Sequence, residues 1–115
     1  MAFKRNILLL AFTFCFSIAF GQNPCNSDIC VIQFNAGWNG ANGVNYLDDL
    51  TDCSTMSVNI EDGTWQQDYG IVVVPTVIVF NGKEVERFQA DISFKIAATR
   101  KEVQSIIDDI IYSDF

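Results

Sequence analysis

Few side chains in this 115-residue sequence could do chemistry. It has no histidine, so it lacks the usual general base and the commonest metal ligand. Acidic pairs such as Asp48-Asp49 and Asp108-Asp109 are typical of solvated helix faces, and no glycine-rich phosphate loop is present. We therefore expect no metal and no cofactor. What remains is thiol chemistry at the four cysteines and binding by uncharged groups, of which the string Trp38-Asn39-Gly40-Ala41-Asn42 is the most concentrated example.

The cysteines do not stand at a redox spacing. Cys25 and Cys30 are separated by four residues and precede an expected strand instead of opening a helix, so no helix dipole would stabilise a thiolate. Cys30 begins that strand and Cys53 comes just before the next one. Adjacent strands lie about 4.8 Å apart, so we expect a structural disulfide that includes Cys53. Cys30 is its preferred partner and Cys25 the alternative.

The beginning of the sequence predicts export. Lys4 and Arg5 precede an uncharged apolar run over residues 7–20, and small residues follow at Ala19 and Gly21. This is the pattern of a signal peptide over residues 1–21, with cleavage after Ala19 or Gly21, and the run is too short for a membrane span. Cys15 would leave with it, so the exported protein, periplasmic or secreted, keeps three cysteines and one unpaired thiol.

Charge excludes one class of partner. Removal of Lys4 and Arg5 leaves five basic against 14 acidic side chains, a net charge of −9. A polyanion is repelled by such a surface, so we expect no binding to nucleic acid. After loss of the signal peptide we also expect no membrane association. The oligomeric state is left open.

The first half of the chain after the signal predicts a β-α-β unit. A polar lead-in, residues 22–29, precedes an apolar, β-branched strand over residues 30–36. Residues 39–51 carry Val44, Leu47 and Leu50 on one face of a predicted helix, and residues 56–60 alternate like a strand. The two strands should be parallel.

The second half predicts a β-β-α unit. A short helix over residues 64–69 ends at Gly70, and an apolar run then meets Asn81-Gly82, a strong hairpin signal before residues 84–89. Thr99 and Glu102 form a capping box for a final helix. The core stripe of this helix is Val103, Ile106, Ile107, Ile110 and Ile111. The whole pattern predicts a single α/β domain over residues 30–113, with a central mixed sheet flanked by helices.

These motifs, in this order, resemble thioredoxin from about residue 30 to residue 111. The family has an apolar strand, Phe-x-Ala-x-Trp and then Cys-Gly-Pro-Cys where this sequence reads VIQFNAGWNGAN. Three later pieces match in order and spacing: Tyr69-Gly70-Ile71, Val74-Pro75-Thr76 and Phe80-Asn81-Gly82-Lys83-Glu84-Val85. The resemblance implies a thioredoxin-like fold.

The departures from the family concern its chemistry. The resemblance places Asn39 and Asn42 at the positions of the two redox cysteines, Ala41 at that of the proline between them, and Gln33 at that of a buried acid. An amide cannot become a thiolate or store two electrons, so we expect no catalytic residue and no thiol exchange at this site.

A binding role is the alternative use of the same positions. Asn39 can cap the predicted helix, and Asn42 can bond locally or to a guest. The resemblance implies a cis Val74–Pro75 bond that leaves a backbone edge free for an extended peptide, with Trp38 beside it. We therefore expect a redox-inactive domain that binds or scaffolds a peptide or protein. The rival hypothesis is a thiol-disulfide oxidoreductase or isomerase that acts through Cys25, Cys30 or Cys53.

Overall fold

The computed structural model describes residue 25 and residues 28–113. The predicted signal peptide lies outside the described residues, as do residues 22–24 and 26–27 of the predicted lead-in. Among the residues that are described, no helix is both long and apolar enough to cross a membrane.

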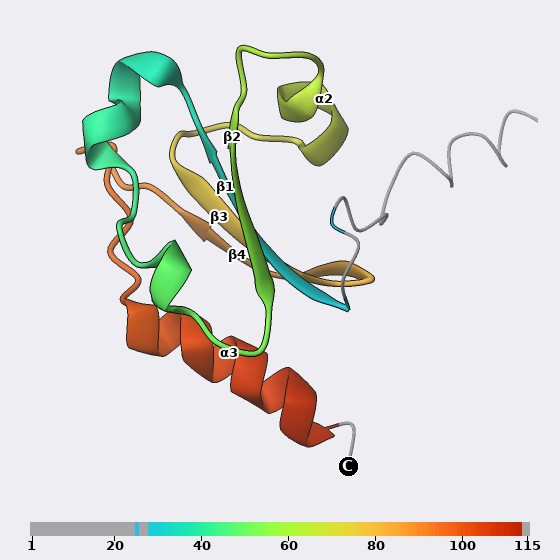
Figure 1. The fold of residues 1–115 in the computed structure, drawn as a ribbon. Coiled ribbons are helices and arrows are strands. Elements are labelled where there is room, and N and C mark those ends of the chain that lie inside the picture. Colours follow the sequence, from blue (N-terminus) through green and yellow to red (C-terminus); the bar gives the residue numbers. More distant parts are fainter. Residues whose placement is uncertain (1–24, 26–27, 114–115) are drawn as a thin grey trace, which may run out of the picture.

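Four strands form one mixed sheet in the order β2-β1-β3-β4 (Figure 1). β1 runs parallel to β2 and antiparallel to β3, and β3 forms an antiparallel hairpin with β4. Gly82 makes the hairpin turn with φ of 82°, a left-handed conformation that glycine adopts at little cost. The parallel β1–β2 pair and the antiparallel β3–β4 hairpin agree with the sequence prediction. The strands are β1 (Ile29–Asn35), β2 (Ser54–Asn59), β3 (Thr76–Asn81) and β4 (Lys83–Gln89).

The two α-helices in the described residues, α2 (Trp65–Tyr69) and α3 (Arg100–Ser113), were both predicted. Gly70 closes α2 in the left-handed conformation, with φ 61° and ψ 46°. At the start of α3 the Glu102 N–H donates to Thr99 Oγ1 at 3.3 Å, one of the two bonds of the predicted capping box. The apolar stripe of α3 faces the sheet, as its spacing predicted.

The predicted helix over residues 39–51 is wrong. The crossover from β1 to β2 instead contains two short 3-10 helices, η1 (Gly37–Asn42) and η2 (Leu47–Asp49). An α-helix here would need the Val44 N–H to bond to the carbonyl four residues earlier, but that N–H donates to Gln33 Oε1 at 2.7 Å. Leu47 and Leu50 are still buried, so the apolar positions were identified correctly and their conformation was not.

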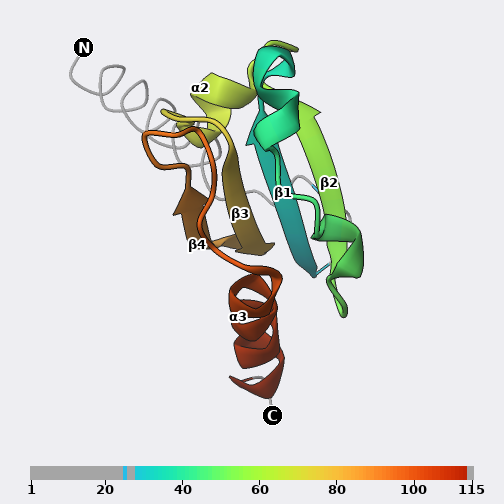
Figure 2. The ribbon, with the colours of Figure 1, turned by 90° about the vertical axis from the view of Figure 1, so that its left-hand side faces the viewer.

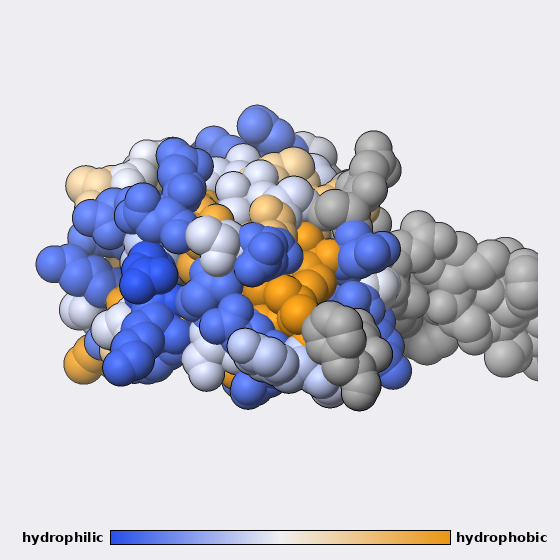
Figure 3. Space-filling view, turned by 60° about the horizontal axis from the view of Figure 1, so that its bottom comes forward, coloured by the Kyte–Doolittle hydropathy of each residue, from blue (hydrophilic) through white to orange (hydrophobic). Residues whose placement is uncertain are grey.

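Alternation of side chains along the strands divides the core into two clusters, one on each face of the sheet. The cluster on the α3 side contains Val31, Val77 and Val79, and the cluster on the α2 side contains Phe34 and Phe80. Figures 1 and 2 agree that η1 and α2 lie at one end of the sheet and α3 at the other. At the α3 end, hydrophilic residues surround an area of apolar surface (Figure 3).

Candidate functional site

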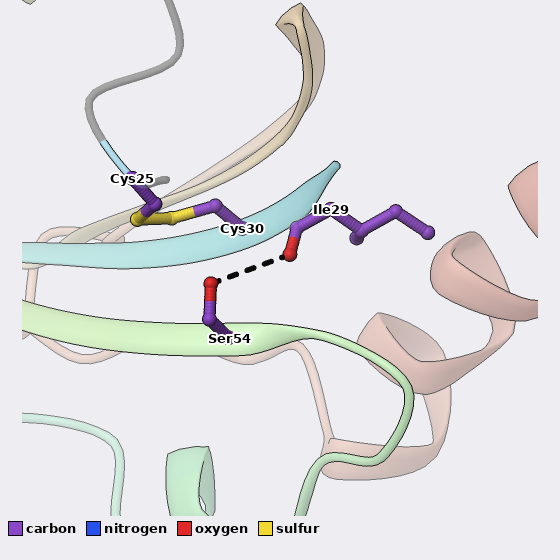
Figure 4. The surroundings of a disulfide bond; sticks show 4 residues. All are labelled: Cys25, Ile29, Cys30 and Ser54. Atoms are coloured by element: carbon purple, nitrogen blue, oxygen red, sulfur yellow. Dashed lines mark hydrogen bonds between the residues drawn. A yellow bond between two sulfur atoms is a disulfide. The ribbon is translucent and has the colours of Figure 1, made fainter. Parts of the chain in front are cut away.

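The structure corrects the predicted disulfide. Cys25 and Cys30 are joined by a disulfide, with their Cα atoms 6.0 Å apart (Figure 4). Cys53 is a free thiol. The register explains why Cys53 pairs with neither. Cys30 lies opposite Ser54, so Cys53 is one residue out of step and its side chain belongs to the other face of the sheet. Cys30 is accordingly part of the α2-side cluster, whereas Cys53 packs against the α3-side cluster.

None of the three cysteines has the surroundings of a reactive thiol. Cys30 is fully buried and disulfide-bonded to the partly buried Cys25. Burial raises the pKa of the Cys53 thiol, and the nearby Asp52 carboxylate raises it further. Both effects disfavour the thiolate, which is the nucleophilic form.

The five predicted binding residues lie at the opposite end of the sheet from α3. Trp38, Asn39 and Asn42 belong to η1, while Val74 and Pro75 form the turn that leads into β3. The Val74–Pro75 bond is cis, as the resemblance implied. The amide of Asn39 reaches the Val74 carbonyl at 3.3 Å, so the two segments are in direct contact.

Asn39 is buried, with 3% of its surface exposed, and its side chain is committed to the fold. Its Nδ2 donates to Asn35 Oδ1 at 3.2 Å and to the carbonyls of Val74 and Phe94 at 3.3 and 3.4 Å. Its Oδ1 accepts from Asn42 Nδ2 at 2.7 Å. The backbone carbonyls can only accept, so this network fixes which end of the amide faces them. Asn39 therefore joins three segments of the chain.

The predicted capping role of Asn39 is wrong. Ala36 precedes η1, and the turn has no side-chain cap. Asn39 lies inside η1 with φ −110° and ψ 18°, at a kink between its two turns. The kink aims its amide inward, toward the turn at Val74, instead of back along its own helix.

Gln33 is also structural. It is buried beneath the crossover, where its Oε1 accepts from the Val44 N–H and its Nε2 donates to Ser57 Oγ at 3.4 Å. The neutral amide can fill both roles at once, whereas an ionised carboxylate could only accept.

An apolar cleft lies beside the Asn39 network. Trp38 is 68% exposed and its ring meets the ring of Phe94 edge to face, with centroids 5.6 Å apart. These two rings, together with Val72, Val74 and Ile60, line a cavity of about 250 Å³. Sequence reasoning missed Phe94 and Val72. The available clue for Phe94 was the alternation of apolar and polar residues over 91–96, DISFKI, in the loop between β4 and α3.

The loop that carries Phe94 is held by local hydrogen bonds. Phe94 has a positive φ of 61°, and its N–H donates to the Asp91 carbonyl at 3.0 Å. The Asp91 carboxylate accepts from the hydroxyl and from the N–H of Ser93, and these bonds lower the pKa of Asp91. The Phe94 ring is thus presented by a tight turn that is also tied to η1 through Asn39.

Comparison with known proteins supports the fold but not a specific activity. No family model matches the sequence, and no curated protein does. The structure is similar to that of a mutant thioredoxin from Halobacterium salinarum NRC-1, with 20% identity and a TM-score of 0.56 over 73% of this chain and 75% of that one. It is also similar to thioredoxin O2 from Arabidopsis thaliana in its oxidized state, with 17% identity and a TM-score of 0.51 over 83% and 85% of the two chains.

A crystal structure of a designed protein is similar to a comparable degree, with 16% identity and a TM-score of 0.53 over 83% of this chain and 86% of that one. Together with the mixed four-stranded sheet and its flanking helices, these likenesses show that the chain has a thioredoxin-like α/β fold.

Proposed function

We propose that this chain is an exported, redox-inactive thioredoxin-like domain that binds an extended peptide segment of a protein partner. The observation that carries the proposal is the apolar cleft, in which the exposed rings of Trp38 and Phe94 stand beside the backbone of residues 72–74. Within residues 28–113, the N–H groups of Val72 and Val74 donate no hydrogen bond. A peptide strand laid beside them would gain backbone bonds and bury the two rings.

The redox part of the proposal rests on the amides. Asn39 and Asn42 stand where the resemblance places the two family cysteines, their side chains meet at 2.7 Å, and they adjoin the cis proline turn. An amide pair in this position can support the turn but cannot exchange disulfides. The Asn39 amide is occupied by the protein itself, so we assign Asn39 to the floor of the site and Trp38 to its contact surface.

The rival oxidoreductase hypothesis is tested with dithiothreitol and insulin. The buried Cys30 and the raised pKa of Cys53 lead us to expect reduction of insulin at the background rate. Turnover above background that disappears in Cys53→Ala would favour the rival.

The binding hypothesis is tested by capture from the exported protein fraction of the native source. The wild-type chain and Tyr112→Ala should retain the same partner, because Tyr112 is an equally exposed aromatic residue on α3, at the far end of the sheet. Trp38→Ala should lose it. Equal capture by all three proteins would reject the cleft as the binding site.

A further inference from the structure

The two edge strands of the sheet differ in how they are protected against pairing. β4 carries four charged residues, and its register with β3 is irregular between Val79 and Phe80. Charges and irregularities of this kind discourage an edge from adding another strand. β2 has neither: its six residues are uncharged, contain no proline and pair with β1 in continuous register.

The outer side of β2 presents backbone groups for pairing. The Ile60 N–H donates to the Asn35 carbonyl at 2.9 Å, so even-numbered residues of this segment bond toward β1. The alternation of a parallel strand then turns the backbone groups of Thr55, Ser57 and Asn59 outward, although the Asn59 carbonyl already accepts from the Asp62 N–H at 3.0 Å. None of their N–H groups donates a hydrogen bond to residues 28–113, and β2 is the outermost strand on its side of the sheet in Figure 2.

The two faces beside this edge differ in chemistry. On the α3 side, Ser57 and Asn59 line a cavity of about 520 Å³ whose floor carries the amides of Gln33 and Asn35. On the α2 side, β2 presents Met56 and other partly buried apolar residues. Successive side chains of an added strand would fall alternately over an uncharged amide surface and beside an apolar one.

Acidic side chains stand at both ends of the edge. Asp49 and Asp52 precede β2 and Glu61 and Asp62 follow it, and all four are exposed. A complementary strand therefore has basic residues at both ends. A second copy of this chain does not fit: antiparallel pairing centred on Ser57 would set Asp52 of one copy against Asp62 of the other, and each copy carries a net charge of −7 before any processing.

We propose that the outer edge of β2 is a second docking surface, separate from the Trp38 cleft. Its occupant is an extended peptide whose uncharged core alternates apolar and polar residues and whose ends are basic. Backbone pairing with Thr55, Ser57 and Asn59 provides the attachment, and the acidic ends select the partner by charge.

The test is a titration of the isotopically labelled chain with a synthetic peptide followed by NMR. The probe has two lysines, the alternating core Thr-Val-Asn-Val-Thr-Val, and two further lysines. We expect amide hydrogen exchange at Thr55, Ser57 and Asn59 to slow by about tenfold or more when the peptide saturates the protein. Added salt should weaken binding, because exposed opposite charges are screened.

Matched variants locate the peptide. Ser57→Lys puts a charge on the outer edge of β2 at an exposed position and should weaken binding by about tenfold. Val85→Lys adds the same charge on β4, where the wild-type side chain is also exposed, and should change the affinity by less than about twofold. Trp38→Ala should bind the probe like the wild type, which separates this surface from the proposed cleft.

Four results would overturn the proposal. These are no binding at all, equal binding of a peptide with glutamates in place of the lysines, protection at Val72 and Val74 instead of β2, and loss of binding in Trp38→Ala. Sedimentation of the free chain supplies a further check. A dimer that Ser57→Lys dissociates would identify a second copy as the occupant and reject the basic peptide.

Discussion

Asn39 shows how one polar side chain can stabilise a site without acting on a substrate. Its Nδ2 faces two backbone carbonyls from separate loops, and its Oδ1 faces a donor on Asn42. Only a side chain with a donor and an acceptor on one short stem satisfies both sides. An ionised carboxylate at this position could only accept, so the neutral amide suits the surrounding carbonyls.

Asn39→Asp should destabilise the fold by about 3 kcal/mol, because it would replace a buried donor with a carboxylate facing carbonyl oxygens. The free energy of unfolding is measured by urea denaturation at neutral pH. Asn45→Asp, at an exposed position nearby, controls for the added charge and should change it by less than about 0.5 kcal/mol. Equal stabilities of the two variants would contradict the Asn39 network.

The Cys53 thiol should react slowly with iodoacetamide in the folded protein, more slowly than free cysteine at the same pH, because burial and Asp52 raise its pKa. Its ionised fraction is then smaller in the folded than in the unfolded chain. The folded chain therefore favours the protonated thiol. The stability that this preference gives the fold is present below the thiol's ordinary pKa and is lost as pH rises through the folded pKa. Asp52→Asn, which suits the positive φ of 64° at that residue, should accelerate alkylation. An unchanged alkylation rate would show that Asp52 does not raise the pKa of the Cys53 thiol.

At the scale of elements, the crossover between β1 and β2 decides the shape of the site. Gln33 holds the Val44 N–H, and Gly43 lies so close that a Cβ there would be 3.1 Å from Gln33 Oε1. A continuous α-helix over this segment is replaced by η1 and η2. The open crossover leaves the amide-floored cavity beside β2.

Gly43→Ala should destabilise the fold by about 1 to 2 kcal/mol, since Gln33 is buried and hydrogen-bonded and cannot move away. Gly40→Ala is the matched control, because a Cβ there meets nothing within 4 Å. Thermal unfolding of the two variants under the same conditions compares them. The close approach of Gln33 is refuted if both variants melt alike.

Sequence patterns predicted correctly those helices and turns that are held by interactions between residues close together in the sequence. The hairpin at Asn81-Gly82, the end of α2 at Gly70 and the stripe of α3 could all be predicted from neighbouring residues. The crossover could not, because its conformation depends on a bond from Gln33, eleven residues before Val44.

The candidate site was predicted only where the resemblance covered it. Trp38, Asn39 and Val74 were found through their match to family motifs, and the structure brings them together. Phe94 was missed because it lies in a loop, outside the motifs that carry the family resemblance. The disulfide was mispredicted because the sequence does not reveal the register that puts Cys30 and Cys53 on opposite faces of the sheet.

At the scale of the whole molecule, the Cys25–Cys30 disulfide fastens the beginning of the described chain to the central strand β1. Peptide mapping of the isolated protein without reduction should find Cys25 linked to Cys30 and Cys53 alkylated. Three alkylated cysteines in freshly isolated material would contradict the pairing.

Cys25→Ser should lower the free energy of unfolding by about 2 kcal/mol in the chain-entropy account of a loop this short. The thiol that remains at Cys30 is buried among apolar residues, where it can stay as a small apolar group. Cys53→Ser, which breaks no disulfide, is the control and should have the smaller effect. Denaturation in the presence of a reductant should make wild type and Cys25→Ser equally stable.

The asparagines of η1 are also sites at which this protein can deamidate. Asn39 and Asn42 each precede a glycine, the neighbour that least hinders attack of the backbone nitrogen on the side-chain amide. The buried, hydrogen-bonded Asn39 is shielded from that reaction while the fold is closed. Local unfolding of η1 would expose the Asn39 amide to deamidation. The deamidated chain would carry a carboxylate at residue 39, which the carbonyls of Val74 and Phe94 repel. Deamidation of Asn39 in storage should therefore be irreversible, and it should be slower than deamidation of Asn81, which also precedes a glycine but is exposed.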